Sequence, residues 1–137
     1  MSARLRRRAG QPPLILIVED DRAVANMIGE FLGSAGFDTE VARDGQDAIS
    51  KAKQFQPDVI IMDLMLPRLT GGEAASRLKQ DQLTALIPIV GISAVADVTA
   101  LAELLPLDEI IPKPFDLDDL MNAIERHLPT WSDEDAS

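Results

Sequence analysis

The stretch LILIVEDD, residues 14–21, decides how this 137-residue chain folds. Five apolar residues run directly into three acids, Glu19, Asp20 and Asp21. A short run of branched apolar residues is typical of a strand buried on both faces of a parallel sheet. Three like charges at its end repel one another and call for a cation nearby. The stretch therefore predicts a buried strand that ends at a charged site.

Short apolar runs and helical patterns alternate along the rest of the chain. Further strands are expected over residues 38–42, 58–62, 87–92 and 108–112. Helices are expected from Val24 to Leu32, after Asp44, over residues 71–80 and 96–105, and between Asp116 and Leu128. Five strands alternating with five helices predict an α/β fold, with one doubly wound parallel sheet and helices on both of its faces.

Composition and charge limit the domain organisation and the partners. We expect a basic disordered leader over residues 1–13, one folded domain over residues 14–128 and an acidic tail over residues 129–137. The leader holds four arginines, which leaves 9 of the 13 basic residues against all 23 acidic ones, a net charge of −14. Such a domain repels nucleic acid. No apolar run is long enough for a signal peptide or a membrane span, so we expect a cytoplasmic protein without a membrane partner.

Side chains with acid, hydroxyl and ammonium groups stand at the ends of the expected strands. They are Glu19, Asp20 and Asp21 after the first strand, Asp63 after the third, Ser93 after the fourth and Lys113 after the fifth. Ligands of open parallel sheets bind at the carboxyl ends of the strands. A carboxylate cluster without histidine or cysteine suits Mg²⁺, and a carboxylate can itself attack a phosphoryl group. The pattern therefore predicts phosphoryl chemistry at this edge.

Four stretches of the chain resemble the bacterial response-regulator receiver domain. They are ILIVEDD, DVIIMDLMLPRLTGGE, IPIVGISA and IIPKPF, and the resemblance spans residues 14–128. It implies a flavodoxin-like strand order 2-1-3-4-5, a cis peptide between Lys113 and Pro114, and a role in two-component signal transduction. The alternation of strands and helices does not by itself fix the strand order, which is implied by the resemblance alone.

The resemblance also implies a role for each site residue. Asp63 accepts a phosphoryl group from a phosphohistidine, forming an aspartyl phosphate. Mg²⁺ is bound by Asp20, by Asp63 and by the backbone carbonyl of Met65, with Glu19 assisting through water. Ser93 and Lys113 bind phosphoryl oxygens.

Three departures from the family pattern concern the end of the domain. Ile110 stands at the switch position, where receivers usually carry tyrosine or phenylalanine. Pro106 and Leu107 replace the usual Gly-Ala before the fifth strand. The segment from Ser93 to Lys113 is about two residues shorter than expected, which predicts a short or irregular fourth helix. Phosphoacceptance is expected to be intact, whereas the usual relay to the output surface is in doubt.

Several residues have a simpler structural interpretation beside the chemical one. Asp21 could be a third metal ligand, but its place before the first helix favours a cap. His127 lies late in the last helix, where a cation suits the helix dipole, and a phosphotransfer role is not expected. Gly29, Gly33 and Gly36 fall within or after a helix and do not form a dinucleotide-binding loop.

Three functions are compatible with the sequence. The first is a stand-alone Mg²⁺-dependent phosphoacceptor that catalyses only its own phosphorylation and dephosphorylation. Its expected partners are a sensor histidine kinase or phosphotransfer protein and an unidentified output protein, and the chain is expected to be a monomer or a weak dimer. The second is a degenerate receiver that binds a partner without phosphorylation. The third, a Mg²⁺-dependent phosphohydrolase, fits less well because VEDD lacks the spacing of its two aspartates.

Two apolar side chains are expected to set the lifetime of the phosphorylated state. In receivers, residues two positions after the acceptor and two after the hydroxyl residue orient the attacking water. Here they are Met65 and Val95, and neither can hold a water by hydrogen bonding. Slow self-dephosphorylation is therefore expected.

Overall fold

The computed structural model of the chain describes residues 11–66, 70–94 and 103–128. Its elements are β1 (Leu14–Val18), α1 (Arg22–Ser34), β2 (Asp38–Ala42), α2 (Gly45–Phe55), β3 (Val59–Asp63), α3 (Gly71–Gln80), β4 (Ile89–Ser93), β5 (Glu109–Pro112) and α5 (Leu117–His127). The five strands form one parallel sheet in the order β2-β1-β3-β4-β5. The predicted α/β class, the parallel sheet and the order 2-1-3-4-5 are confirmed.

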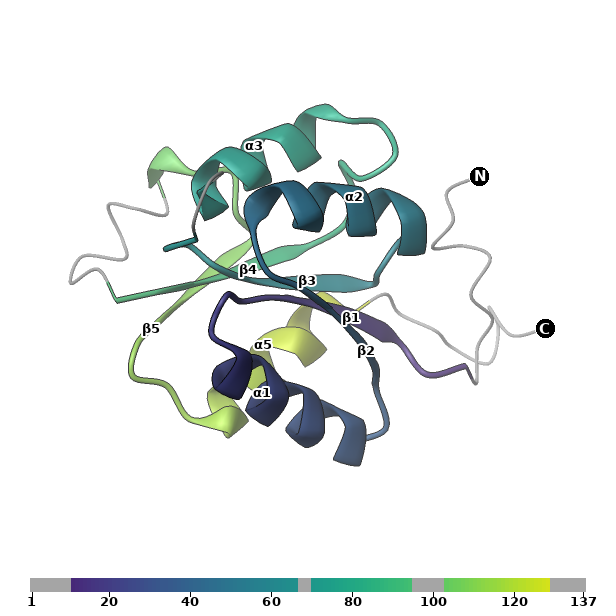
Figure 1. Ribbon diagram of the computed structural model, residues 1–137, viewed down its shortest axis with the longest axis vertical. Helices are drawn as coiled ribbons and strands as arrows, with labels where there is room; N and C mark the ends of the chain where they lie inside the picture. Colours follow the sequence, from purple (N-terminus) through teal and green to yellow (C-terminus); the bar gives the residue numbers. More distant parts are fainter. Residues whose placement is uncertain (1–10, 67–69, 95–102, 129–137) are drawn as a thin grey trace.

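The sheet is the middle of three layers, with α2 and α3 on one face and α1 and α5 on the other (Figure 1). Successive side chains of a strand point to opposite faces, so each strand contributes to two cores. Leu16 and Val18 pack with the apolar side chains of α2 and α3. Ile15 and Ile17 pack with those of α1 and α5. Burial on both faces explains why the central strands β1 and β3 are nearly continuous apolar runs, whereas the edge strand β2 carries polar residues.

Side-chain caps fix where the helices begin. The Asp21 carboxylate accepts hydrogen bonds from the backbone N–H groups of Ala23 at 2.9 Å and Val24 at 3.3 Å. The interpretation of Asp21 as a cap is therefore confirmed. Asp44 caps α2 as predicted, with its Oδ1 accepting from the Asp47 N–H at 2.8 Å. Asp116 occupies the N-cap position of α5, also as predicted.

Two predicted strands are shifted along the chain, and this shift brings site residues into the sheet. The third strand ends at Asp63 rather than one residue earlier, and Asp63 pairs with Ile92. The fourth begins at Ile89, because the N–H of Ile87 is used in a turn to Thr84 and Pro88 has no N–H. That strand then includes Ser93, which pairs with Pro112 of β5.

Parts of the predicted organisation lie outside the described residues. The structure describes four of the five predicted helices, and residues 95–102 of the predicted helix 96–105 are outside it. Glu103 and Leu104, near the end of that prediction, are helical. The leader up to residue 10 and the tail over residues 129–137 also lie outside the described part.

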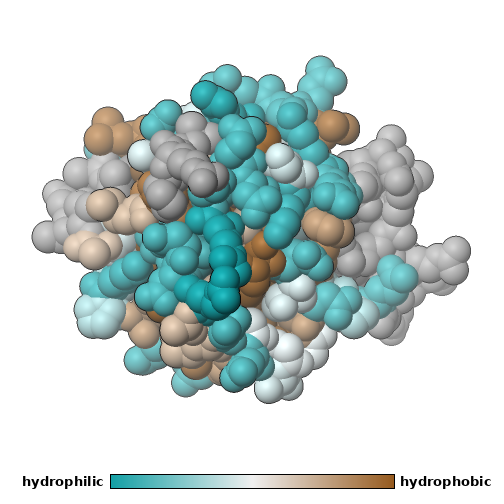
Figure 2. Space-filling model, viewed as in Figure 1, coloured by the Kyte–Doolittle hydropathy of each residue, from teal (hydrophilic) through white to brown (hydrophobic). Residues whose placement is uncertain are grey.

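The surface is mostly polar where the structure describes it. Hydrophilic side chains cover most of the face seen in Figure 2, with smaller hydrophobic areas between them. The large apolar side chains that are exposed are Met27, Met65, Leu83, Leu86 and Leu104. Among the described residues, no helix has both the length and the apolar character needed to cross a bilayer.

The start of α3 lies directly against the chain that follows β3. A Cβ atom on Gly71 would be 2.7 Å from the backbone oxygen of Asp63 and 2.7 Å from the Cα of Leu64. Only a residue without a side chain permits this approach, because real Cβ contacts do not occur at such distances. Gly71 thus sets how closely α3 packs on the end of β3.

We predict that Gly71→Ala destabilises the fold by about 1–3 kcal/mol, because the added methyl group must push two backbone segments apart. Gly33→Ala is the matched control, since a Cβ at that helical position meets no atom within 4 Å. It should be neutral or stabilising by up to about 1 kcal/mol. Denaturant unfolding of both variants measures the difference, and equal effects would contradict the close-packing argument.

Candidate functional site

Three carboxylates meet at the carboxyl ends of β1 and β3. Glu19 and Asp20 follow β1 directly, and Asp63 is the last residue of β3. One carboxylate oxygen from each lies within 4.8 Å of the other two. Glu19 and Asp63 are buried, at 5% and 4% exposure, whereas Asp20 is exposed. The parallel pairing of β1 with β3 produces this convergence, because it aligns the ends of the two strands.

The backbone around Glu19 fixes its place in the cluster. Its N–H donates to the carbonyl of Ala42, at the end of β2, at 2.9 Å. Its Oε2 accepts from the N–H of Asp21 at 3.1 Å. Asp21, the third acid of LILIVEDD, therefore contributes its backbone N–H to the site, while its carboxylate caps α1.

Asp63 is held by contacts to both of its carboxylate oxygens. Oδ1 accepts from the backbone N–H of Met65 at 2.9 Å. Oδ2 forms an ion pair with Lys113 Nζ at 3.1 Å. These two contacts hold the buried Asp63 carboxylate in a defined orientation. The Lys113 ammonium group contacts one of its oxygens, and the carboxyl groups of Glu19 and Asp20 lie nearby.

Lys113 reaches the site because β5 pairs with β4. Its N–H donates to the carbonyl of Ser93 at 2.8 Å. The peptide bond between Lys113 and Pro114 is cis, as the resemblance implied. Ser93 is buried, at 1% exposure, at the end of β4. The sheet therefore brings the hydroxyl residue and the lysine to the same edge as the carboxylates.

Burial and crowding raise the pKa of Glu19 to about 7. Removal of the carboxylate from water is the largest cause, and the negative charge of Asp63 and hydrogen bonds with Asp20 and Asp63 add to it. The hydrogen bond from the Asp21 N–H opposes the shift. The raised pKa of Glu19 thus reflects its burial first and the neighbouring acids second.

The donor set fits a hard divalent cation. All three converging side chains offer oxygen, and a closely spaced group of carboxylates without nitrogen or sulfur ligands suits Mg²⁺ better than a transition metal. The residues that could hold such an ion are Glu19, Asp20 and Asp63. The backbone carbonyl of Met65, the further ligand expected from the resemblance, stays a prediction.

The remaining predicted residues lie in different places. The side chain of Met65 is 69% exposed, two residues after Asp63. Val95 lies outside the described residues. Ile110 is half-buried within β5. His127 Nε2 lies 2.9 Å from Oε1 of Glu109, the first residue of β5, at the opposite end of that strand from Lys113. His127 is therefore paired with Glu109 and lies at the opposite end of β5 from the site formed by Glu19, Asp20 and Asp63.

Two features of the site were missed by reasoning from the sequence. The first is the N–H of Met65 as a donor to Asp63, which only the turn after β3 reveals. The second is Gly71, whose close approach shapes that turn. The glycine pair in LTGGE, at the start of an expected helix, was the available signal for a backbone contact.

The sequence of this chain is similar to those of several known proteins. The family pattern described as response regulator receiver domain matches residues 15–125. The transcriptional regulator RpaA of Synechocystis sp. is 35% identical over 118 residues, which cover 85% of this chain and 49% of that protein. Protein PilG of Pseudomonas aeruginosa is 27% identical over 89% of this chain and 92% of its own length. The chain spans about half the length of RpaA and of TrcR from Mycobacterium tuberculosis.

Solved structures show the same fold. The chemotaxis response regulator CheY4 of Vibrio cholerae superposes with a TM-score of 0.79 at 26% identity, over 85% of this chain and 99% of that one. The receiver domain of a sensor histidine kinase from Pseudomonas aeruginosa has a TM-score of 0.77 at 25% identity, over 85% and 97% of the two chains. That structure holds a magnesium ion coordinated in its active-site cleft. Fold, site and family pattern together place this chain in the response regulator receiver domain family.

Proposed function

We propose that Asp63 accepts a phosphoryl group in a Mg²⁺-dependent reaction and that this event switches the binding of a partner protein. One observation carries the proposal: Asp63 is a buried carboxylate held by Lys113 and by the Met65 N–H, beside two further acids. A carboxylate fixed in this way has lost the freedom to turn away from a phosphoryl donor. The family supports the same role.

The proposed transfer is a substitution at phosphorus. A carboxylate oxygen of Asp63 forms the new P–O bond, while the bond from phosphorus to the imidazole nitrogen of a phosphohistidine breaks. The imidazole leaves with the electron pair and takes a proton from solvent. The product is a mixed anhydride between the Asp63 carboxyl group and phosphate. The chain itself supplies the nucleophile and the groups around it, and so it acts as a phosphoacceptor and not as a classical enzyme.

Charge neutralisation is the main task of the neighbouring residues. Lys113 already contacts one oxygen of Asp63, and we propose that its ammonium group binds a phosphoryl oxygen after transfer. The Ser93 hydroxyl would donate to a second phosphoryl oxygen. Asp20 and Asp63, the Met65 carbonyl and Glu19 through water would hold Mg²⁺. The bound ion would neutralise the carboxylates and the phosphoryl oxygens.

The proposed partners follow from the family and from the charge. A sensor histidine kinase or a phosphotransfer protein would supply the phosphoryl group, and an output protein would read the phosphorylated state. The acidic folded domain makes direct nucleic-acid binding unfavourable. We further propose a cytoplasmic location and a monomer or weak dimer.

A second candidate function rests on Ile110. This half-buried residue on β5 has no aromatic ring and no hydroxyl group, so it cannot provide the aromatic switch expected of the family. The alternative is a receiver that binds its partner without phosphorylation. Retained binding of that partner by an Asp63→Asn protein would favour this alternative.

Incubation with acetyl phosphate and Mg²⁺, followed by intact-mass measurement, tests the proposed function. We expect one phosphate adduct on the wild-type chain and none on Asp63→Asn, because the amide nitrogen of asparagine is not a nucleophile at phosphorus. Asp21→Asn is the matched control: asparagine also caps helices, so this variant should be labelled like the wild type. An adduct on Asp63→Asn would show that another residue reacts.

The pKa of Glu19 predicts how stability depends on pH when no metal is bound. Its pKa is raised from 4.5 to about 7 on folding, so the folded state holds the proton more tightly. The free energy of unfolding should therefore fall as the pH rises from about 4.5 to about 7.

Asp20→Asn removes one charge beside Glu19 and should stabilise the metal-free protein. Urea unfolding with a chelator at several pH values measures both the pH dependence and the effect of this substitution. Added Mg²⁺ should raise the melting temperature of the wild type. A metal-free Asp20→Asn protein less stable than the wild type would refute the argument that the neighbouring carboxylates repel one another.

The phosphorylated state should be long-lived. The exposed Met65 and the predicted neighbour Val95 offer no group to orient an attacking water. Met65→Asn and Val95→Glu should each speed the loss of the phosphoryl group by roughly tenfold, since an oriented water reacts faster. The measurement is the decay of the adduct at fixed Mg²⁺ after removal of the donor. Unchanged decay in both variants would show that these positions do not control the water.

A further inference from the structure

Leu64, the residue directly after Asp63, is enclosed by backbone on two sides. On one side Gly71 comes so close that its added Cβ would be 3.0 Å from Leu64 Cδ2. On the other side a Cβ on Gly91 of β4 would be 3.3 Å from both methyl groups of Leu64. The side chain is 8% exposed. Two glycines therefore leave just enough room for this leucine behind the acceptor.

Leu107 also lies next to Gly91. Its Cδ1 lies 2.9 Å from the point where a Cβ on Gly91 would stand. The methyl groups of Leu107 and Leu64 thus converge on the same gap in β4. Leu107 is partly buried and packs on the core that α2 and α3 share with the sheet. Leu64 and Leu107 therefore share the space that the missing side chain of Gly91 leaves open.

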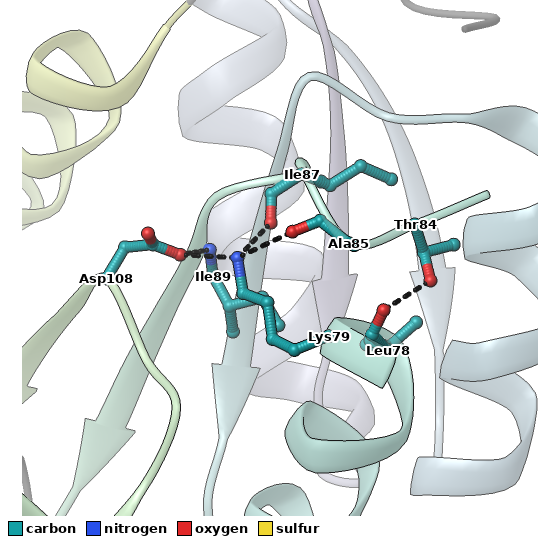
Figure 3. A network of polar contacts seen from close by, with 7 residues as sticks. All are labelled: Leu78, Lys79, Thr84, Ala85, Ile87, Ile89 and Asp108. Atoms are coloured by element: carbon teal, nitrogen blue, oxygen red, sulfur yellow. Dashed lines mark hydrogen bonds and ion pairs between the residues drawn. The ribbon is translucent and has the colours of Figure 1, made fainter. Parts of the chain in front are cut away.

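A polar network fixes the segment that carries Leu107 (Figure 3). The N–H of Asp108 donates to the carbonyl of Ile89 at 2.9 Å, and the N–H of Ile89 donates to Asp108 Oδ2 at 2.7 Å. Lys79 Nζ, at the end of α3, donates to the same carboxylate oxygen at 3.0 Å and to the carbonyl of Ile87 at 2.9 Å. Asp108 is thereby joined to α3 and to the start of β4, two residues before Gly91.

We propose that Leu107 is a positioning residue for Asp63 and acts through Leu64. The inference rests on the proposed function. Asp63 Oδ1 accepts its hydrogen bond from Met65, on the far side of Leu64, so a shift of Leu64 changes the orientation of the Asp63 carboxylate. The same shift changes its distance to Lys113, which now lies 3.1 Å from Oδ2. Leu107 holds Leu64 against Gly71 and prevents this movement.

Leu107→Ala tests the proposal by opening a gap into which Leu64 can move. With acetyl phosphate and Mg²⁺, we expect phosphorylation about tenfold slower than in the wild type, as small misplacements of a reacting group have effects of this order. Mg²⁺ binding, measured by calorimetry, should weaken severalfold, since Asp63 is one of the proposed ligands. Leu107→Met keeps the space filled and should behave like the wild type in both measurements.

Leu105→Ala is the matched control. It removes the same atoms from the same segment, but Leu105 lies against Gly72 of α3, with its Cδ2 3.0 Å from the position of an added Cβ. A purely structural role would slow both alanine variants alike, whereas we expect wild-type phosphorylation and Mg²⁺ affinity for Leu105→Ala. The double variant Gly91→Ala with Leu107→Ala places a methyl group back into the gap and should recover much of the rate.

The outcomes separate this inference from the proposed function. A wild-type chain that is not labelled contradicts the proposed function, and the Mg²⁺ affinities then decide the role of Leu107. Wild-type rate and affinity in Leu107→Ala overturn the inference. Equal loss in Leu105→Ala, or no recovery in the double variant, also overturns it.

Discussion

The crowding of three carboxylates at one edge of the sheet is the constraint on which the rest of the site depends. Parallel pairing of β1 with β3 brings the oxygens of Glu19, Asp20 and Asp63 within 4.8 Å of one another. Lys113, which follows the edge strand β5, forms an ion pair with Asp63 of this cluster. The lysine arrives there only because β4 and β5 are in register. Folding therefore gathers negative charge at one place, which a bound cation would offset.

Much of the fold and of the site could be predicted because both follow from short-range patterns. Branched apolar runs mark strands buried on both faces, and the carboxyl ends of parallel strands converge at one edge of the sheet. That reasoning was enough to bring Asp20, Asp63 and Lys113 together. It also identified Asp21 as a cap, since a cap is defined by the next three residues.

The rest depends on contacts between distant segments, which a periodic pattern does not contain. Pro106 and Leu107 stood out in the sequence as a departure from the family pattern, but nothing local shows that Leu107 lies against Gly91 of the neighbouring strand β4. The same holds for the approach of Gly71 to Leu64. The exact start of a strand was also missed, because β4 begins only after a turn that uses the N–H of Ile87 and after Pro88.

The position of β5 limits how another chain can join this sheet. Among the described strands it stands at one end of the sheet, has four residues and finishes at Pro112, which has no N–H. Short edge strands that end in proline are poor templates for strand addition. A protein that binds this side of the domain would therefore bind mainly through side chains, because added backbone hydrogen bonds contribute little there. Selectivity then rests on shape and charge, which evolve one residue at a time without disturbing the sheet.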